Sequence, residues 1–176
     1  EIASTNLVLQ SQDFSVTWGA IGTALTLTSG TEVLGALSLD TLDDTSATSA
    51  QGKSQTITFT GNAQKAISIF VKNGTSTSSV VRLRDNTGGA NRLLAAITWS
   101  GTTPVVTMTT GTDLTGTPEQ LGSSGVYRLS FLTTTVTAAS VNVLGIFPAT
   151  DASIAVAGTG TVECGGVQAE NALVST

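Results

Sequence analysis

The sequence predicts an all-β fold, a sandwich or barrel of roughly ten short antiparallel strands. Apolar and polar residues alternate with a period of two in one segment after another, which is typical of half-buried strands. No segment keeps a helical period over three turns. Charged residues make up only 11% of the chain. Helix formers such as Lys and Glu are therefore scarce, while β-branched Thr is abundant.

The clearest strand is Ala66–Lys72, in which Ile67, Ile69 and Val71 line one face and Phe70 the other. The remaining expected strands are Ala24–Thr28, Val33–Leu42, Gln55–Thr60, Val80–Arg84, Leu93–Trp99, Val105–Thr109, Gly125–Thr133, Ser140–Phe147 and a closing strand from Thr161. In Val33–Leu42 the alternation places Leu37, Leu39 and Thr41 on one face and Ala36, Ser38 and Asp40 on the other.

Turn and loop residues separate these segments. Asn73-Gly74 predicts a hairpin or turn because both residues tolerate a positive φ. Asp85–Asn91 reads as a glycine-rich turn, and Asp43–Lys53 and Gly111–Ser124 as polar surface loops. No repeat or linker divides the chain, so we expect one domain over residues 1–176.

The two ends of the chain are predicted to meet. Leu7 and Leu9 alternate with Val8 in a short strand within Asn6–Trp18, and Phe14 and Trp18 follow as bulky core anchors. Val162–Glu170 is its expected partner strand near the other end of the chain. We also expect Ile69, Leu129 and Phe131 to be buried with Phe14 and Trp18.

Charge and hydropathy exclude two classes of partner. A net charge of −5 with only seven scattered basic residues argues against nucleic acid, which needs a clustered basic face. Arg82 and Arg84 share a strand face, where a solvated edge or cross-strand ion pairs are favoured over an anion site. The most apolar long window, Phe131–Pro148, is interrupted by polar residues, so no membrane span is expected.

The residue inventory predicts that the protein is not an enzyme. The chain has no histidine, which excludes Ser-His-Asp and Cys-His catalysis. Its single cysteine, Cys164, can form neither an intrachain disulfide nor a structural zinc site, and is expected to be a small buried hydrophobe. The acids lie mostly in predicted loops, and Glu163 and Glu170 flank a terminal strand. No catalytic, cofactor-binding or metal-binding residue is therefore assigned.

Two weaker ligand hypotheses remain. Asp43-Asp44 and Asp85-Asn86 offer hard oxygen ligands for calcium, although such residues more often make turns. Trp18, Trp99 and Tyr127 are the aromatic side chains that could stack on sugar rings. Trp18 and Tyr127 are expected in the core, whereas Trp99 is open to either interpretation.

Four motifs in register resemble a family of bacteriophage virion modules. They are Asn6-Leu7 with Ser11, Asp13, Phe14, Ser15 and Trp18; Ser68–Gly74 (SIFVKNG); Gly125–Ser130 (GVYRLS); and Gly166–Glu170 (GVQAE). The segment Arg92–Ser124 departs from the family pattern. The resemblance implies a jelly-roll β-sandwich similar to carbohydrate-binding modules, with no common catalytic residue.

The resemblance implies that the protein is a non-enzymatic structural protein on the virion surface. Decoration of the capsid is the leading hypothesis. The alternative is a glycan-binding module of a tail fibre or of a polysaccharide-acting protein. The implied partners are the major capsid protein or other virion proteins, and a host-surface glycan in the alternative. Uncharged stretches such as Thr107–Thr110 and Thr133–Ala139 further predict a homo-oligomer, with a trimer favoured over a hydrated monomer.

Overall fold

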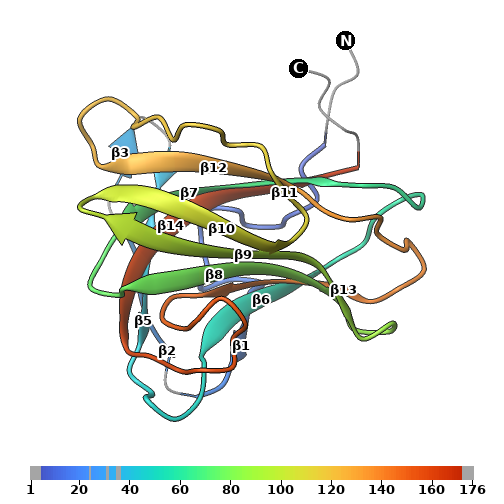
Figure 1. Cartoon of the computed structure of the whole chain (residues 1–176), viewed down its shortest axis with the longest axis horizontal. Helices are drawn as coiled ribbons and strands as arrows, with labels where there is room; N and C mark the ends of the chain where they lie inside the picture. Colours follow the sequence, from blue (N-terminus) through green and yellow to red (C-terminus); the bar gives the residue numbers. More distant parts are fainter. Residues whose placement is uncertain (1–4, 24, 31, 35–36, 172–176) are drawn as a thin grey trace.

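The chain folds into two packed antiparallel sheets (Figure 1). A computed structural model describes residues 5–23, 25–30, 32–34 and 37–171. Within these residues there are strands, turns and loops but no helix, which confirms the predicted all-β sandwich. Accordingly, no helix of the described chain is long and apolar enough to cross a membrane.

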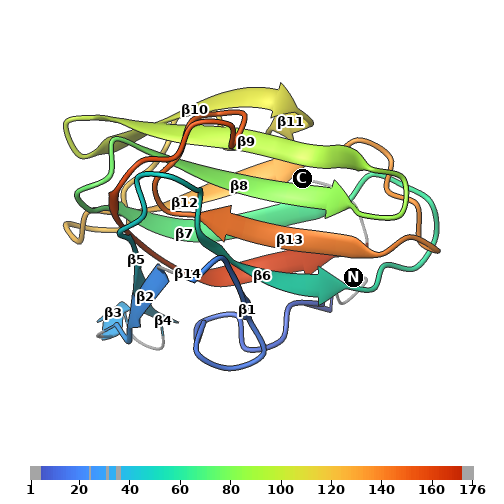
Figure 2. The same cartoon turned by 90° about the horizontal axis from the view of Figure 1, so that it is seen from below.

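Each sheet has six strands, and a short ribbon of two strands lies beside them. Sheet A, seen face-on in Figure 2, consists in spatial order of β1 (Gly19–Ile21), β6 (Gly52–Ile57), β13 (Asn142–Phe147), β8 (Ser78–Asp85), β9 (Ala90–Ser100) and β10 (Thr103–Thr110). Sheet B consists of β11 (Thr112–Asp113), β12 (Val126–Leu132), β7 (Ala66–Asn73), β14 (Gly160–Glu170), β5 (Asp40–Asp44) and β2 (Leu25–Thr28). The ribbon pairs β3 (Glu32–Leu34) with β4 (Leu37–Ser38).

The chain crosses repeatedly between the two sheets. Strands β5, β6, β7 and β8 alternate between sheet B and sheet A, and β12, β13 and β14 alternate again. The late strands insert between earlier ones: β14 lies between β7 and β5, and β13 lies between β6 and β8. Such interleaving places strands that are far apart in the chain side by side in one sheet.

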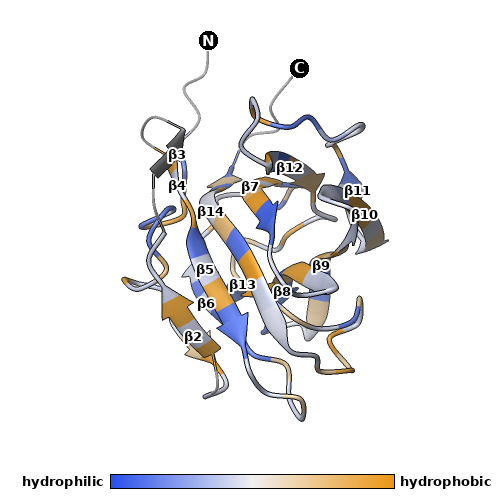
Figure 3. Ribbon diagram, turned by 90° about the vertical axis from the view of Figure 1, so that its left-hand side faces the viewer, coloured by the Kyte–Doolittle hydropathy of each residue, from blue (hydrophilic) through white to orange (hydrophobic). Residues whose placement is uncertain are grey.

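The core lies between the sheets and is formed by alternate residues of each strand. Phe14, Ile69, Leu129 and Phe131 are fully buried and Trp18 nearly so, as predicted. Figure 3 shows this pattern along part of β14, where apolar and polar residues alternate. The Cys164 side chain is buried in the same core, as predicted, and burial raises the pKa of its thiol.

The N-terminal segment closes one side of the sandwich without forming the predicted strand. The Asn6 side chain forms hydrogen bonds of the kind that a backbone peptide group forms in a strand. Its Nδ2 donates to the Val167 carbonyl at 3.0 Å, and its Oδ1 accepts from the amides of Val8 and Ala169. Leu7 N–H also donates to Ala169 O at 2.9 Å. The predicted meeting of the two ends is thus correct. The predicted strand is wrong, since Val8 is buried and Leu9 is 64% exposed.

The expected strand Val33–Leu42 is divided in the structure. The described part of this segment contributes residues of β3, β4 and the start of β5, and β3 pairs with β4 in an antiparallel ribbon. Ala36 lies outside the described residues. Asp40 is buried, and its carboxylate accepts the amides of Phe14 (2.8 Å) and Gly30 (2.9 Å). These two long-range bonds are invisible to a local alternation pattern.

Asn73-Gly74 is a crossover and not a hairpin. Strand β7 belongs to sheet B and β8 to sheet A, so the segment after Asn73 carries the chain from one sheet to the other. Gly74 does not adopt a positive φ; it is required by close approach, because a Cβ there would lie 2.4 Å from the Thr161 carbonyl oxygen. The turn within Asp85–Asn91 does form a hairpin, joining β8 to β9.

Candidate functional site

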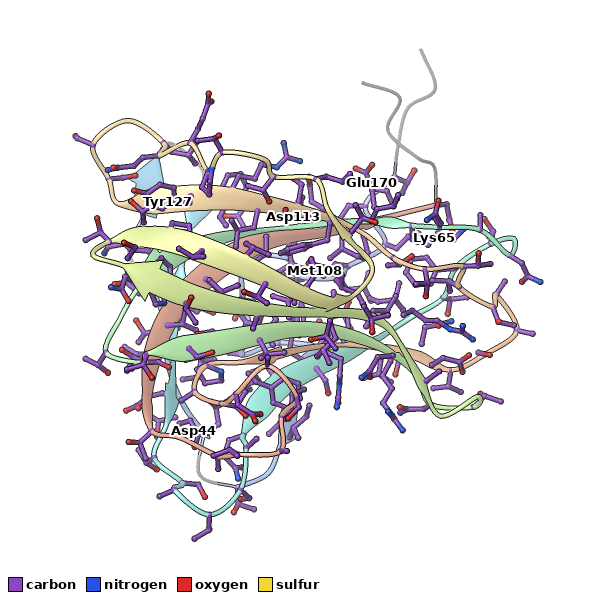
Figure 4. All side chains as sticks on the ribbon, viewed as in Figure 1. Asp44, Lys65, Met108, Asp113, Tyr127 and Glu170 are labelled. Carbon is purple, nitrogen blue, oxygen red and sulfur yellow. The ribbon has the colours of Figure 1, made fainter. Side chains whose placement is uncertain are left out.

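A concave surface lies on the outer face of sheet B. A hollow of about 230 Å³ is lined by residues of β7, β12, β14 and the segment after β11, among them Ser68, Leu114, Arg128, Gln168 and Glu170. A second hollow adjoins it and shares Leu114, Arg128 and Ser130. We call the two together the sheet B groove. Figure 4 labels Glu170, which lines the first hollow, and Asp113, which directly precedes the groove residue Leu114, at the upper side of the molecule.

Strand register brings these polar side chains together. Ser68 of β7 lies opposite Ser130 of β12 on one side and Gln168 of β14 on the other. The register of β14 shifts between Gly165 and Gln168, and this irregularity aligns Gln168 with Ser68. The neighbouring rows place Arg128 opposite Phe70, and Glu170 opposite Ala66.

Arg128 is held in a defined position over the sheet. Its Nη2 donates to Ser68 Oγ at 3.3 Å and to Gln168 Oε1 at 3.2 Å. The guanidinium carbon lies 5.9 Å from the centre of the Phe70 ring, within the range of a cation–π contact. Neither of the two described ion pairs involves Arg128. It is therefore an oriented cation without a carboxylate partner among the described residues.

Glu170 contributes an acceptor with no partner. Its Oε2 atom is buried yet makes no hydrogen bond within the described part of the chain. A carboxylate oxygen removed from water normally finds a donor, so an unpaired one deserves an explanation. Glu170 is also one of the residues that line the first hollow.

The segment after β11 forms the wall of the groove. Leu114 N–H donates to Ser130 O at 2.8 Å, and Ser130 N–H donates to Thr115 Oγ1 at 2.9 Å. Asp113 tightens the same turn by accepting Thr115 N–H. These bonds fasten the segment to β12 and leave the Leu114 side chain 52% exposed beside the groove.

The three aromatic candidates for sugar stacking do not line this groove. Trp18 and Tyr127 are buried in the core, as predicted. Trp99 is half-buried and packs against the same core, and its indole Nε1 is buried without a partner. All eight aromatic side chains of the protein lie in the described residues, and each of them is buried or half-buried.

The candidate calcium ligands already serve the fold. Asp44 is fully buried and accepts the amides of Ser46 and Gln51. Asp85 accepts Gly88 N–H at 2.7 Å and the Arg92 guanidinium at 2.8 Å, and these contacts hold the pKa of its carboxyl below the ordinary value. Within the described ranges, no three acidic or cysteine side chains gather in a way that could hold a metal ion.

The other charged candidates are separated from the groove or paired. Arg82 and Arg84 lie on β8, an interior strand of sheet A, and make none of the described ion pairs, so the expected edge or ion-paired setting is wrong. Glu163 forms an ion pair with Lys72, with its two carboxylate oxygens at 2.9 and 3.0 Å from Lys72 Nζ.

Sequence reasoning missed the site itself. The sequence places Arg128 and Gln168 only in the family's strand motifs, and Glu170 also among the acids that flank the terminal strand. Their alternation with buried Leu129 and Ala169 does predict that they face away from the core. Their proximity depends on the pairing of β12, β7 and β14, which no local pattern reveals.

Comparison with known proteins gives a likeness in fold. No protein-family model matches the chain, and no curated protein matches it in sequence. Among solved structures, the chain is similar to the enzymatically active domain of tailspike protein 4 from bacteriophage CBA120, with a TM-score of 0.55 and 15% sequence identity. The likeness covers 93% of this chain and 21% of the tailspike chain, so this chain spans about a fifth of that protein's length.

Proposed function

We propose that this chain is a non-enzymatic structural module of a bacteriophage virion, which decorates the capsid surface. The proposal rests on the contacts that the four motifs resembling phage virion modules make with one another. Asn6, from the first motif, hydrogen-bonds to Val167 and Ala169, from the last. Gly125–Ser130 and Ser68–Gly74 lie mainly on the paired strands β12 and β7. The four motifs therefore act as one structural unit.

The likeness to a bacteriophage tailspike domain supports the same origin. It extends over 93% of this chain, at an identity of 15%. The name of that domain states that it is enzymatically active, and at such identity only the fold is shared. A virion component of this fold accounts for both the sequence motifs and the structural likeness.

The placement of the acids supports a non-catalytic role. The carboxylates of Asp40, Asp44 and Asp85 accept backbone amides, and Glu163 is paired with Lys72. General acid–base chemistry on a polysaccharide needs two carboxylates facing one cleft. In the described chain most acids are instead committed to turns and pairs, while Glu170 and Glu119 line the two different hollows of the sheet B groove. Incubating the purified protein with host polysaccharide should release no reducing ends, and release abolished by an Asp or Glu substitution would contradict the proposal.

We also propose self-association, with a trimer favoured. The outer face of edge strand β10 presents Val105, Thr107 and Thr109, which are all exposed and uncharged. Thr98 of β9 lies next to Val105 in register. A neutral face of this kind packs against copies of itself without burying unpaired charge. Sedimentation of the protein, free and bound to capsids, measures the assembly state.

The decisive experiment is location in the virion. Antibody against the purified protein should label the heads of intact particles, and tagged protein should bind saturably to capsids that lack it. Labelling confined to tails or fibres would overturn capsid decoration and favour the tail-fibre alternative. Absence of the protein from purified particles would overturn the virion proposal altogether.

A further inference from the structure

The sheet B groove combines a cation and an acceptor that the fold itself leaves unused. The described hydrogen bonds of Arg128 engage only Nη2, so its other guanidinium N–H groups have no protein acceptor there. No carboxylate lies within ion-pairing distance of this guanidinium in the described chain, although Glu170 and Glu119 line the same groove. An unpaired guanidinium in a hollow favours an anionic ligand, because its planar donors match a carboxylate.

Glu170 sets a second requirement on the ligand. Its buried Oε2 atom accepts no hydrogen bond from the described residues. Because Glu170 lines the hollow, a ligand that fills it meets a carboxylate and is favoured if it brings a donor, such as a hydroxyl group. A simple inorganic anion would satisfy Arg128 and leave Glu170 unsatisfied.

The size of the first hollow and the residues that line both hollows restrict the class of ligand. The first hollow, about 230 Å³, falls below the range of roughly 300–1,000 Å³ for drug-sized ligands, so it suits one small ring. Ser68 and Ser130 line it with hydroxyl groups, and Thr115 and Thr117 line the adjoining hollow. Leu114 adds an apolar wall for the C–H face of a ring. These features favour a saccharide over a peptide.

We propose that the sheet B groove binds a carboxylated saccharide of the uronic-acid class. Arg128 receives the sugar carboxylate, and Glu170 accepts a ring hydroxyl. Gln168 and Ser68 hold the guanidinium in place and hydrogen-bond the same ring. Recognition in this groove relies on charge and hydrogen bonds and not on aromatic stacking, since no exposed aromatic side chain is present in the described chain. The site does not depend on where in the virion the protein resides.

The test is a titration of the whole protein with two matched probes, followed by amide chemical shifts. Methyl glucuronide should shift the amides of Ser68, Arg128, Ser130 and Gln168 saturably. Methyl glucoside, which lacks the carboxylate, should bind at least about tenfold more weakly, as expected for loss of a charge-assisted hydrogen bond. Equal binding of the two sugars would overturn the assigned role of Arg128.

Two variants and a control locate the site. Arg128→Gln should weaken glucuronide binding at least about tenfold. Glu170→Gln keeps the shape of the side chain and should weaken both sugars. Arg84→Gln removes an arginine from sheet A and should change neither affinity. Both groove residues have partly exposed side chains on the outer face, and an unchanged amide spectrum away from the groove verifies folding.

The same titration also tests two competing classes of ligand, a plain anion and an acidic peptide. Acetate tests for a plain anion site, and N-acetylglutamate methylamide tests for an acidic peptide. If either shifts the groove amides as strongly as the glucuronide, the saccharide assignment is wrong. If none of the probes shifts these amides, or if Arg128→Gln leaves the glucuronide shifts intact, the groove is not a binding site for this class of sugar.

Discussion

The outer face of each sheet carries an arginine that packs over a phenylalanine, but the two arginines differ in how far they are exposed. On sheet B, Arg128 lies over Phe70 at 5.9 Å and is exposed, with hydrogen bonds to Ser68 and Gln168. On sheet A, Arg82 lies over Phe147 at 4.9 Å and is largely covered. Its Nε is buried without a described partner, and burial, followed by the nearby charge of Arg84, lowers the pKa of its guanidinium.

The difference arises from what covers each face. Phe147 joins Val80, Leu94 and Ala96 in a second apolar cluster outside sheet A. Ala152 and Ile154, from the segment between β13 and β14, pack onto this cluster. The outer face of sheet B is hollowed beside Arg128 instead. An arginine over a phenylalanine therefore stabilises packing on one face and remains available for binding on the other.

The largest expected effect is on stability, from truncating the two rings. Phe147→Ala should lower the free energy of unfolding by about 3–5 kcal/mol, because a buried ring leaves a cavity. Phe70→Ala should cost only about 1–2 kcal/mol, because its ring is half-buried and loses less area. Urea denaturation of both variants measures the difference. Equal losses would mean that the two faces are packed alike.

A smaller effect is expected from the arginines themselves. Arg82→Ala should destabilise the protein by about 1–2 kcal/mol through lost packing of its stem on Phe147. Arg128→Ala should change stability by no more than about 0.5 kcal/mol, because its side chain is exposed. Thermal melts of the two variants, read against wild type, rank them. A larger loss for Arg128→Ala would show that its role is structural.

Lowering the pH should weaken the contacts that the Asp85 carboxylate makes with Gly88 and Arg92 at the end of β8. The Gly88 amide, and then Arg92, hold the pKa of Asp85 below its ordinary value in the folded state. A lowered folded pKa adds stability that is complete above the unfolded value of about 3.9 and is lost as the pH falls through the folded value. Melting temperature should therefore fall below about pH 4 more steeply in wild type than in Asp85→Asn. Parallel curves would contradict this.

A similarly small effect is expected from the described ion pair on the outer face of sheet B. The side chains of Lys72 and Glu163 are 34% and 28% exposed, so water and salt screen their attraction. A double-mutant cycle with Lys72→Met and Glu163→Gln should give a coupling energy of about 0.2–1 kcal/mol, which decreases in high salt. A coupling well above this range would mean that the outer face of sheet B is drier than its exposure indicates.

Part of the candidate site was open to prediction and part was not. Alternation in Gly125–Ser130 correctly separates buried Tyr127 and Leu129 from outward-facing Arg128. The same reasoning cannot tell that Arg128 is exposed whereas Arg82 is covered, because both residues alternate with buried neighbours in the same way. Trp99 shows the same limit: it is the last residue of a predicted strand, and only its packing places it against the core.

The sequence by itself determined the all-β class, the main strands and the residues that fill the core. These follow from local periodicity, because a pleated strand alternates its faces whatever it pairs with. Only the tertiary structure decided the division of Val33–Leu42, the crossover at Asn73-Gly74 and the sheet B groove. Each depends on contacts between residues far apart in the chain, such as Asp40 with Phe14 and Ser68 with Gln168. Local alternation contains no information about which distant strand or loop becomes a neighbour.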